Sequence, residues 1–147
     1  MRINRLNLKN LRNHINTEIE LEKLNVFYGL NGSGKTSILE AISICSISKS
    51  FLPSLDQALV KLGQSGYNVS AKCFTNLDSK YDISIQYNIG KKKEISSNSD
   101  DNLNPGDIIG NLPTVVLSPD YKNITFGSPS DRRQFIDKLL SQVSKRY

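Results

Sequence analysis

The chain has 147 residues, enough for one domain with a hydrophobic core but too few for two sizeable domains. Its composition, 37% hydrophobic and 22% charged, is that of a soluble protein without a membrane-spanning run, and the N-terminal residues lack the apolar core of a signal peptide, so we expect a cytoplasmic protein. The net charge of +5 is compatible with an anionic partner, but charges of this size are also common on soluble surfaces. Cys45 and Cys73 form no ligand-spaced set with the single histidine, so we expect both in the core.

Residues 1–22 alternate between apolar and polar side chains, which predicts an antiparallel hairpin with its turn between Asn10 and Asn16. The turn contains Arg12, Asn13 and His14. Because this hairpin leads directly to the next motif, the tripeptide could lie over a bound nucleotide, with Arg12 at a phosphate and His14 at the base or sugar. The alternative is an ordinary solvated turn.

A phosphate-binding loop follows the hairpin. The apolar run from Leu24 to Tyr28 predicts a buried strand, and the residues after it fit the pattern G-x-x-x-x-G-K-[ST]. A helix should begin near Lys35, because apolar residues then recur at helical spacing. The pattern is formed by Gly29, Leu30, Asn31, Gly32, Ser33, Gly34, Lys35 and Thr36. The apolar face of the helix is expected to contain Ile38, Leu39, Ile42 and Cys45.

The order of strand, loop and helix predicts the binding of a nucleoside triphosphate. Glycines let backbone N–H groups turn toward phosphate oxygens, and the start of a helix adds unpaired donors and a partial positive charge. Lys35 would reach the β- and γ-phosphates, and the Thr36 hydroxyl would bind the Mg²⁺ that bridges them. We expect Gly29 and Gly34 to serve the turn and Gly32 to allow close approach of the phosphate. The same loop serves ATPases, GTPases and small-molecule kinases, so it does not define the reaction.

The middle of the chain predicts a short helix over residues 55–62 and a β-hairpin formed by residues 69–74 and 81–89, with a third strand near Ile95. Residues 96–104 are expected to form a polar loop. Lys91, Lys92 and Lys93 precede the third strand, where they either contact a nucleic-acid backbone or occupy a solvated turn.

The sequence from Asp107 to Gly110 matches the D-x-x-G pattern of GTPases, but the chain has no N-K-x-D guanine motif, so we expect a local turn or short helix. Thr114 to Leu117 predicts another buried strand. Asp120 follows it, yet Pro119 argues against a Walker B aspartate, because that aspartate ends a strand and proline starts a turn.

The last segment predicts a helix with Ser128 as N-cap, Pro129 at the first helical position and Asp131 in the first turn. Arg132 and Arg133 either belong to a solvated first turn or, because cations at a helix start oppose its dipole, have a phosphate or carboxylate partner. The expected apolar stripe contains Phe135, Ile136, Leu139, Leu140, Val143 and Tyr147.

These motifs, in this order, resemble the N-terminal part of the RecF family of bacterial recombination-repair ATPases, which belong to the SMC and ABC-type class. Residues 8–14 are similar to the family's first hairpin, residues 29–36 to its Walker A loop and residues 38–42 to its following helix. Most specific are residues 119–137, with their Gly-x-Pro, double arginine and Phe-x-Asp. Thr125 and Leu52 depart from the family pattern, where an aliphatic residue and an arginine are usual.

The resemblance implies an α/β P-loop NTPase head of ABC/SMC type, with a mixed sheet, an antiparallel subregion and an inserted β-hairpin region near residues 67–96. We expect the head over residues 1–147 to be incomplete at the C-terminus, because the family's Walker B acid, signature motif and switch histidine would follow Tyr147. The chain alone should therefore be inactive in hydrolysis.

The resemblance also implies ATP and Mg²⁺ as cofactors and a homodimer whose two heads enclose ATP. The complete protein would bind single-stranded, gapped or junction DNA and hydrolyse ATP slowly. It would act with RecO and RecR to load recombinase and support the SOS response. Arg132, Arg133, Lys91, Lys92 and Lys93 are the candidate DNA contacts. Two alternatives are a non-catalytic nucleotide- or DNA-binding module and a P-loop small-molecule kinase.

Overall fold

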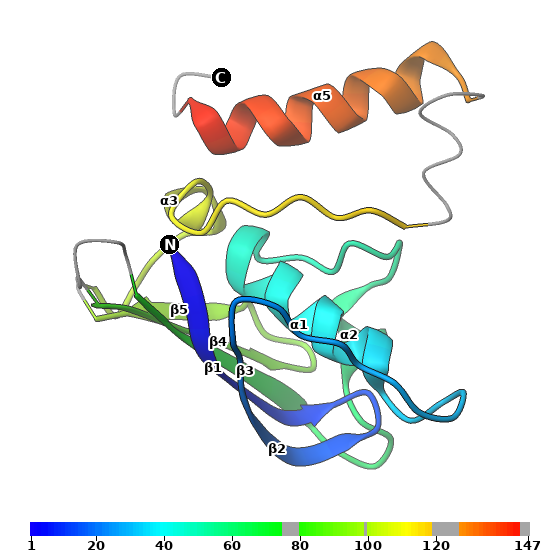
Figure 1. Cartoon of the computed structure of the whole chain (residues 1–147). Helices are drawn as coiled ribbons and strands as arrows, with labels where there is room; N and C mark the ends of the chain where they lie inside the picture. The colour runs from blue at the N-terminus through cyan, green and yellow to red at the C-terminus, as the bar shows by residue number, and fades with distance from the viewer. Residues whose placement is uncertain (75–79, 99, 119–126, 145–147) are drawn as a thin grey trace.

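The computed structural model describes residues 1–74, 80–98, 100–118 and 127–144 (Figure 1). The turn expected at residues 76–79 therefore lies outside the described residues. The same holds for Pro119, Asp120, Thr125 and Tyr147. Within the described ranges, no helix is both long enough and apolar enough to pass through a lipid bilayer.

A five-stranded antiparallel sheet forms the base of the molecule, with the strand order β2-β1-β3-β4-β5. The strands are β1 (Arg2–Leu11), β2 (His14–Glu20), β3 (Gly66–Phe74), β4 (Lys80–Asn88) and β5 (Glu94–Ser97). Both hairpins and the third strand expected from alternation are confirmed. The N-terminal strand β1 is an interior strand, because it pairs with β2 on one side and with β3 on the other.

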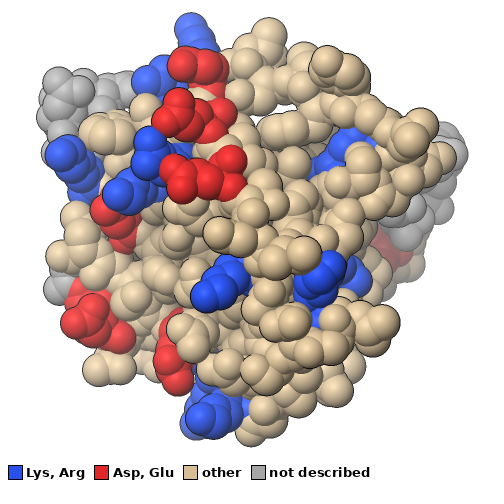
Figure 2. Space-filling view, turned by 90° about the horizontal axis from the view of Figure 1, so that it is seen from below, with Lys and Arg blue, Asp and Glu red and all other residues tan. Residues whose placement is uncertain are grey.

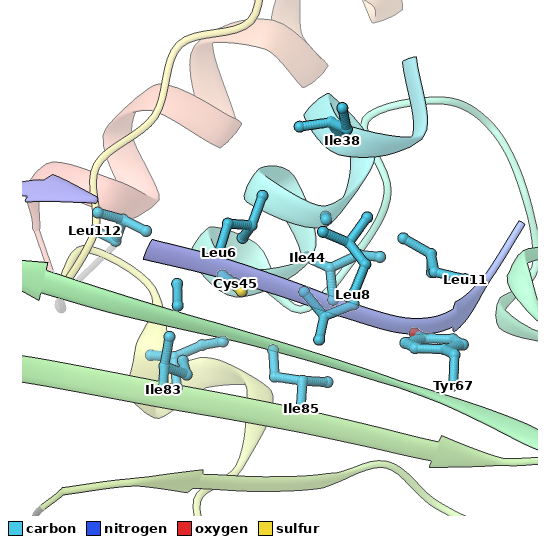
Figure 3. Packing of buried hydrophobic residues seen from close by; sticks show 14 of the residues in the cluster. Leu6, Leu8, Leu11, Ile38, Ile44, Cys45, Tyr67, Ile83, Ile85 and Leu112 are labelled. Carbon is cyan, nitrogen blue, oxygen red and sulfur yellow. The ribbon is translucent and has the colours of Figure 1, made fainter. Parts of the chain in front are cut away.

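One face of the sheet forms the core together with α1 (Lys35–Ile47). Figure 3 shows Leu6 and Leu8 of β1 on the side of this helix, where Ile44 and Cys45 meet them. Cys45 and Cys73 are both buried and unpaired, as expected. The opposite face of the sheet is polar, and Figure 2, seen from that side, shows acidic and basic side chains lying among one another.

The buried face of α1 differs from the expected one. Leu39 is exposed, whereas Ala41 and Ile44 are buried in its place. The helix also buries polar side chains, including Ser46, whose hydroxyl donates to the Leu112 carbonyl at 2.7 Å. Because α1 lies between the sheet and residues 111–118 (Figure 1), it is covered on two sides, so one apolar stripe does not describe it.

The two expected buried strands, 24–28 and 114–117, are wrong for the described residues. Both segments are extended, but no described strand pairs with either of them. Tyr28 is 91% exposed and Leu117 is 92% exposed. An apolar run becomes a strand only when a neighbouring strand completes its backbone hydrogen bonds. The edge strands of the described sheet, β2 and β5, pair with neither segment. We refer to residues 24–28 and 114–117 as the exposed segments, because their residues are exposed except for the half-buried Phe27, Thr114 and Val116.

The described residues also form the helices α2 (Asp56–Leu59), α3 (Pro105–Ile108) and α5 (Pro129–Val143). The second helix is shorter than expected, and α3 confirms a short helix near Asp107. In α5 the expected cap is confirmed, since Ser128 and Asp131 form a reciprocal capping box. Hydrogen bonds from Ser128 lower the pKa of the Asp131 carboxyl.

Helix α5 lies beyond residues 111–118 on the far side of α1 from the sheet (Figure 1), and none of its side chains is fully buried. It is attached through Gln142, whose side-chain amide accepts from the Thr114 N–H at 2.7 Å and donates to the Thr114 carbonyl at 3.3 Å. The Gln142 side chain thus bonds both backbone polar groups of Thr114, as a neighbouring strand would.

Candidate nucleotide-binding site

Residues 29–34 form a tight loop between the exposed segment 24–28 and the start of α1. Gly29, Gly32 and Gly34 have φ angles of 147°, 80° and 97°, which side-chain-bearing residues rarely adopt. A Cβ at Gly32 would meet nothing within 4 Å, whereas one at Gly34 would meet the Asn13 Oδ1 atom at 2.7 Å. Protein atoms thus approach the loop closely at Gly34, whereas the space at Gly32 is open, and the expected close approach of a phosphate at Gly32 stays a prediction.

Lys35, the first residue of α1, folds its side chain back over the loop. Its Nζ atom donates to the Gly29 carbonyl at 3.0 Å and to the Leu30 carbonyl at 2.8 Å. Phosphate oxygens are stronger acceptors than neutral carbonyls, because the hydrogen bond is then assisted by charge on both sides. The ammonium is thus placed at the loop, where an anion would attract it.

The turn of the β1–β2 hairpin lies against the same loop. Asn13 donates from Nδ2 to the Gly32 carbonyl at 2.8 Å, and the His14 Nε2 atom lies 3.1 Å from the Gly34 carbonyl oxygen. A carbonyl oxygen can only accept, so Nε2 carries a proton, and the neutral ring then accepts from Thr17 Oγ1 at 2.9 Å through Nδ1. The structure thus places Asn13 and His14 against the backbone of the loop, and their expected contact with a nucleotide stays a prediction.

Arg12 forms an ion pair with a buried carboxylate on α1. Its guanidinium donates to both oxygens of Glu40, at 2.8 and 3.1 Å, and to the Ala58 carbonyl at 3.0 Å. Glu40 is 2% exposed and also accepts from the Ser50 hydroxyl at 2.8 Å. A buried carboxylate needs such partners, because its desolvation is otherwise very costly. Arg12 borders the nucleotide cleft, and its charge is directed at Glu40.

A cleft of about 370 Å³ opens between the hairpin turn and the phosphate loop. The first N–H groups of a helix have no partner within the helix, and those of α1 begin at this cleft. The described residues contain no cluster of three or more His, Cys, Asp or Glu that could hold a metal. A Mg²⁺ ion here would therefore depend on the Thr36 hydroxyl and on phosphate oxygens. The lining residues are Arg12, Asn13, Asn31, Gly32, Gly34, Lys35, Thr36 and Ser37.

The candidate DNA contacts differ in exposure and in the partners of their side chains. Lys91 and Lys92 are exposed, but the Lys93 side chain is only 10% exposed and forms an ion pair with Asp56 at 2.7 Å. Lys93 also donates to the Ser48 carbonyl, so it serves the packing of β5 against α1. Arg132 and Arg133 are exposed and donate to backbone carbonyls near the start of α5.

Sequence reasoning missed the residues that support the site from behind. Lys61 donates from Nζ to the Asn13 carbonyl at 3.1 Å, and the Arg12 N–H donates to the Leu59 carbonyl at 2.7 Å. Glu40 requires a basic partner because its carboxylate is buried, but this burial is known only from the structure. The partner's identity depends on tertiary structure, so the sequence alone could not supply it.

Comparisons with known proteins agree with this geometry. The chain is 38% identical to the DNA replication and repair protein RecF of Ruminiclostridium cellulolyticum over its whole length, and it spans about 40% of that relative. A solved structure of the recombination mediator protein RecF with ATP matches 99% of the chain with a TM-score of 0.92 at 31% identity, covering 39% of that structure. These matches confirm the resemblance to RecF.

The head-type fold is confirmed as well. A structure from work on ATP-driven dimerization and DNA-stimulated activation of SMC ATPases matches 93% of the chain, and 98% of its own length, with a TM-score of 0.70 at 20% identity. At that identity the match concerns the fold alone. The family model described as AAA ATPase domain matches residues 1–141, so this chain, with its phosphate loop and basic first helical residue, belongs to that ATPase family.

Proposed function

We propose that this chain is the ATP-binding part of a RecF-type DNA repair and replication protein and that its phosphate loop holds ATP with Mg²⁺. The observation that carries the proposal is the loop itself. Its glycine conformations, the Lys35 ammonium and the first turn of α1 converge on one cleft that Thr36 also lines. When bound, Mg²⁺ would neutralise charge on the phosphates, and Thr36 supplies the hydroxyl ligand.

The complete protein would bind single-stranded, gapped or junction DNA in an ATP-dependent manner and work in the cytoplasm. It would form an ATP-dependent homodimer, cooperate with RecO- and RecR-type proteins in recombinase loading and support the SOS response. The family and the relatives' names support a role in DNA replication and repair. The chain spans about 40% of the RecF relative, and we propose that the acidic residue for hydrolysis belongs to the part of that family outside the match, so we expect ATP binding without turnover here.

The first test measures binding of a fluorescent ATP analogue, with Mg²⁺, to the purified chain and to Lys35→Ala. We expect the variant to bind at least about tenfold more weakly, because a charge-assisted contact is lost. Lys72→Ala is the matched control, since Lys72 is an exposed lysine of β3 on the sheet. Equal affinity of all three proteins would contradict the proposal.

A second test measures ATP turnover in the same proteins, with and without gapped DNA. No turnover by the 147-residue chain is expected. Robust turnover that Lys35→Ala abolishes would show that a general base and a metal carboxylate lie within this chain, against the expectation that the Walker B acid is elsewhere.

DNA binding is tested by fluorescence anisotropy with gapped DNA at several salt concentrations. If Arg132 and Arg133 contact phosphates, replacing both by alanine lowers the slope of log affinity against log salt by about two. The double variant Lys91→Ala/Lys92→Ala tests the second candidate surface in the same way. Lys93 is omitted, because its replacement would disturb packing.

A further inference from the structure

We propose that Asn13 and His14 are positioning residues that set the phosphate loop in its nucleotide-binding shape before a nucleotide arrives. We call these two side chains the hairpin clamp. The inference rests on the ATP-binding function proposed above and adds to it how the site is prepared. It also differs from the sequence-based expectation, in which the same side chains touch the nucleotide itself.

The clamp acts on two peptide planes of the loop. In a planar trans peptide the carbonyl and the following N–H point in opposite directions. His14 holds the Gly34 carbonyl at 3.1 Å, so the Lys35 N–H points the opposite way. This N–H is a first-turn donor, which has no partner within the helix and suits an anion. Asn13 fixes the Gly32 carbonyl at 2.8 Å in the same manner.

The clamp also explains why position 34 requires glycine. Besides its φ of 97°, a Cβ there would collide with the His14 Nε2 atom and lie 2.7 Å from the Asn13 Oδ1 atom. The two side chains thus touch the loop backbone directly. Contact and hydrogen bonding together leave this part of the loop few alternative conformations.

Neighbouring residues hold the two clamp side chains in place. Thr17 occupies the His14 Nδ1 atom at 2.9 Å, and Lys61 donates to the Asn13 carbonyl at 3.1 Å. The adjoining Arg12 is fixed by Glu40 and by the Leu59 carbonyl. Both ring nitrogens of His14 and the Asn13 amide nitrogen therefore have protein partners. A loop ordered in advance binds its ligand more tightly, because less conformational freedom is lost on binding.

The experiment compares Asn13→Ala and His14→Ala with wild type, measuring ATP affinity with Mg²⁺ and thermal unfolding to verify folding. Each variant should bind ATP about fivefold more weakly, the loss typical of one neutral hydrogen bond. His14→Gln should recover most of the affinity, because its side-chain amide can still donate to the Gly34 carbonyl. Asn16→Ala, an exposed position of β2, serves as the control and should match wild type.

Two further measurements separate the clamp from other roles. Amide exchange without nucleotide should accelerate at Ser33 and Ile38, whose N–H groups donate to the Leu30 and Gly34 carbonyls, in both clamp variants. Affinities for ATP, GTP and tripolyphosphate should fall by equal factors. A loss confined to ATP would mean that His14 recognises the base, and a loss shared by ATP and GTP but absent with tripolyphosphate would mean that it recognises the sugar. Either result would overturn the clamp.

The outcomes also separate this inference from the proposed function. If Lys35→Ala abolishes ATP binding while both clamp variants bind and exchange like wild type, the clamp is refuted and the ATP site stands. If wild type itself binds no ATP, the proposed function fails, and the exchange rates of Ser33 and Ile38 alone decide whether Asn13 and His14 order the loop.

Discussion

The core and the exposed segments use the same kinds of apolar residue with opposite results. Leu8 of β1 is fully buried between the sheet and α1, whereas Leu117 is almost fully exposed. Both lie in extended, apolar sequence, so strand propensity does not separate them. The difference is that β1 has hydrogen-bonding neighbours on both sides and a helix above it. Burial here depends on partners, and only the core has its partners within the described chain.

The most direct way to break this comparison is to remove one leucine from each region. Leu8→Ala should reduce the free energy of unfolding by about 3 kcal/mol, because it deletes a fully buried side chain and leaves a cavity. Leu117→Ala should change it by less than about 0.5 kcal/mol. Urea denaturation of both variants measures these values. Equal losses would mean that the segment 114–117 is packed in solution.

The comparison can be sharpened with two arginines, Arg5 of β1 and Arg12 of the turn that follows it. Arg12→Ala should cost about 2 to 3 kcal/mol, somewhat less than a wholly buried pair, because Arg12 is 31% exposed but Glu40 is left buried without its cation. Arg5 pairs with Glu18 and Glu20 on the surface, so Arg5→Ala should cost no more than about 1 kcal/mol. Denaturant titration of the two variants tests the ranking, and its reversal would disprove it.

A smaller effect is expected where α5 meets the extended chain. Gln142→Ala removes both hydrogen bonds to Thr114 and should destabilise the packing of α5 by about 1 kcal/mol. Amide exchange in α5 should accelerate while the sheet stays protected. Gln134→Ala, at an exposed position of the same helix, is the control. Faster exchange in the sheet as well would show that α5 and the core unfold together.

The smallest effect is confined to alkaline pH. Burial raises the pKa of the Cys73 thiol from 9.0 to about 11. The folded state thus holds this proton more tightly, so the stabilisation is complete below pH 9 and is lost as the pH rises through 11, by no more than about 1.4 kcal/mol per pH unit. Melting temperatures between pH 8 and 11 should fall less steeply in Cys73→Ala. Identical curves would show that this thiol does not contribute.

The sequence predicted well those features that depend on local pattern. Alternation identified β3 and β4, and the capping residues Ser128 and Asp131 placed the start of α5. The phosphate loop was recognisable because its glycines and lysine follow a fixed spacing. Each of these signals is contained within a few consecutive residues.

Features that join distant residues could not be predicted in the same way. Nothing near Arg12 in the sequence identifies Glu40 as its partner, and nothing in the lysine run distinguishes Lys93 from Lys91. The apolar runs 24–28 and 114–117 predict strands, because a run of apolar residues indicates a segment that becomes buried. The run does not indicate which residues bury it. Partners of this kind are decided by topology.

The interior position of β1 in the sheet has a consequence for how the chain folds. The first strand to be synthesised must wait for β3, starting at Gly66, before its second edge is paired. The whole phosphate loop and α1 lie in the segment enclosed by that pairing, so the pairing of β1 with β3 must close a long stretch of chain, which costs conformational entropy. Deleting β1 would separate β2 from β3 and should abolish folding, although the loop sequence remains intact.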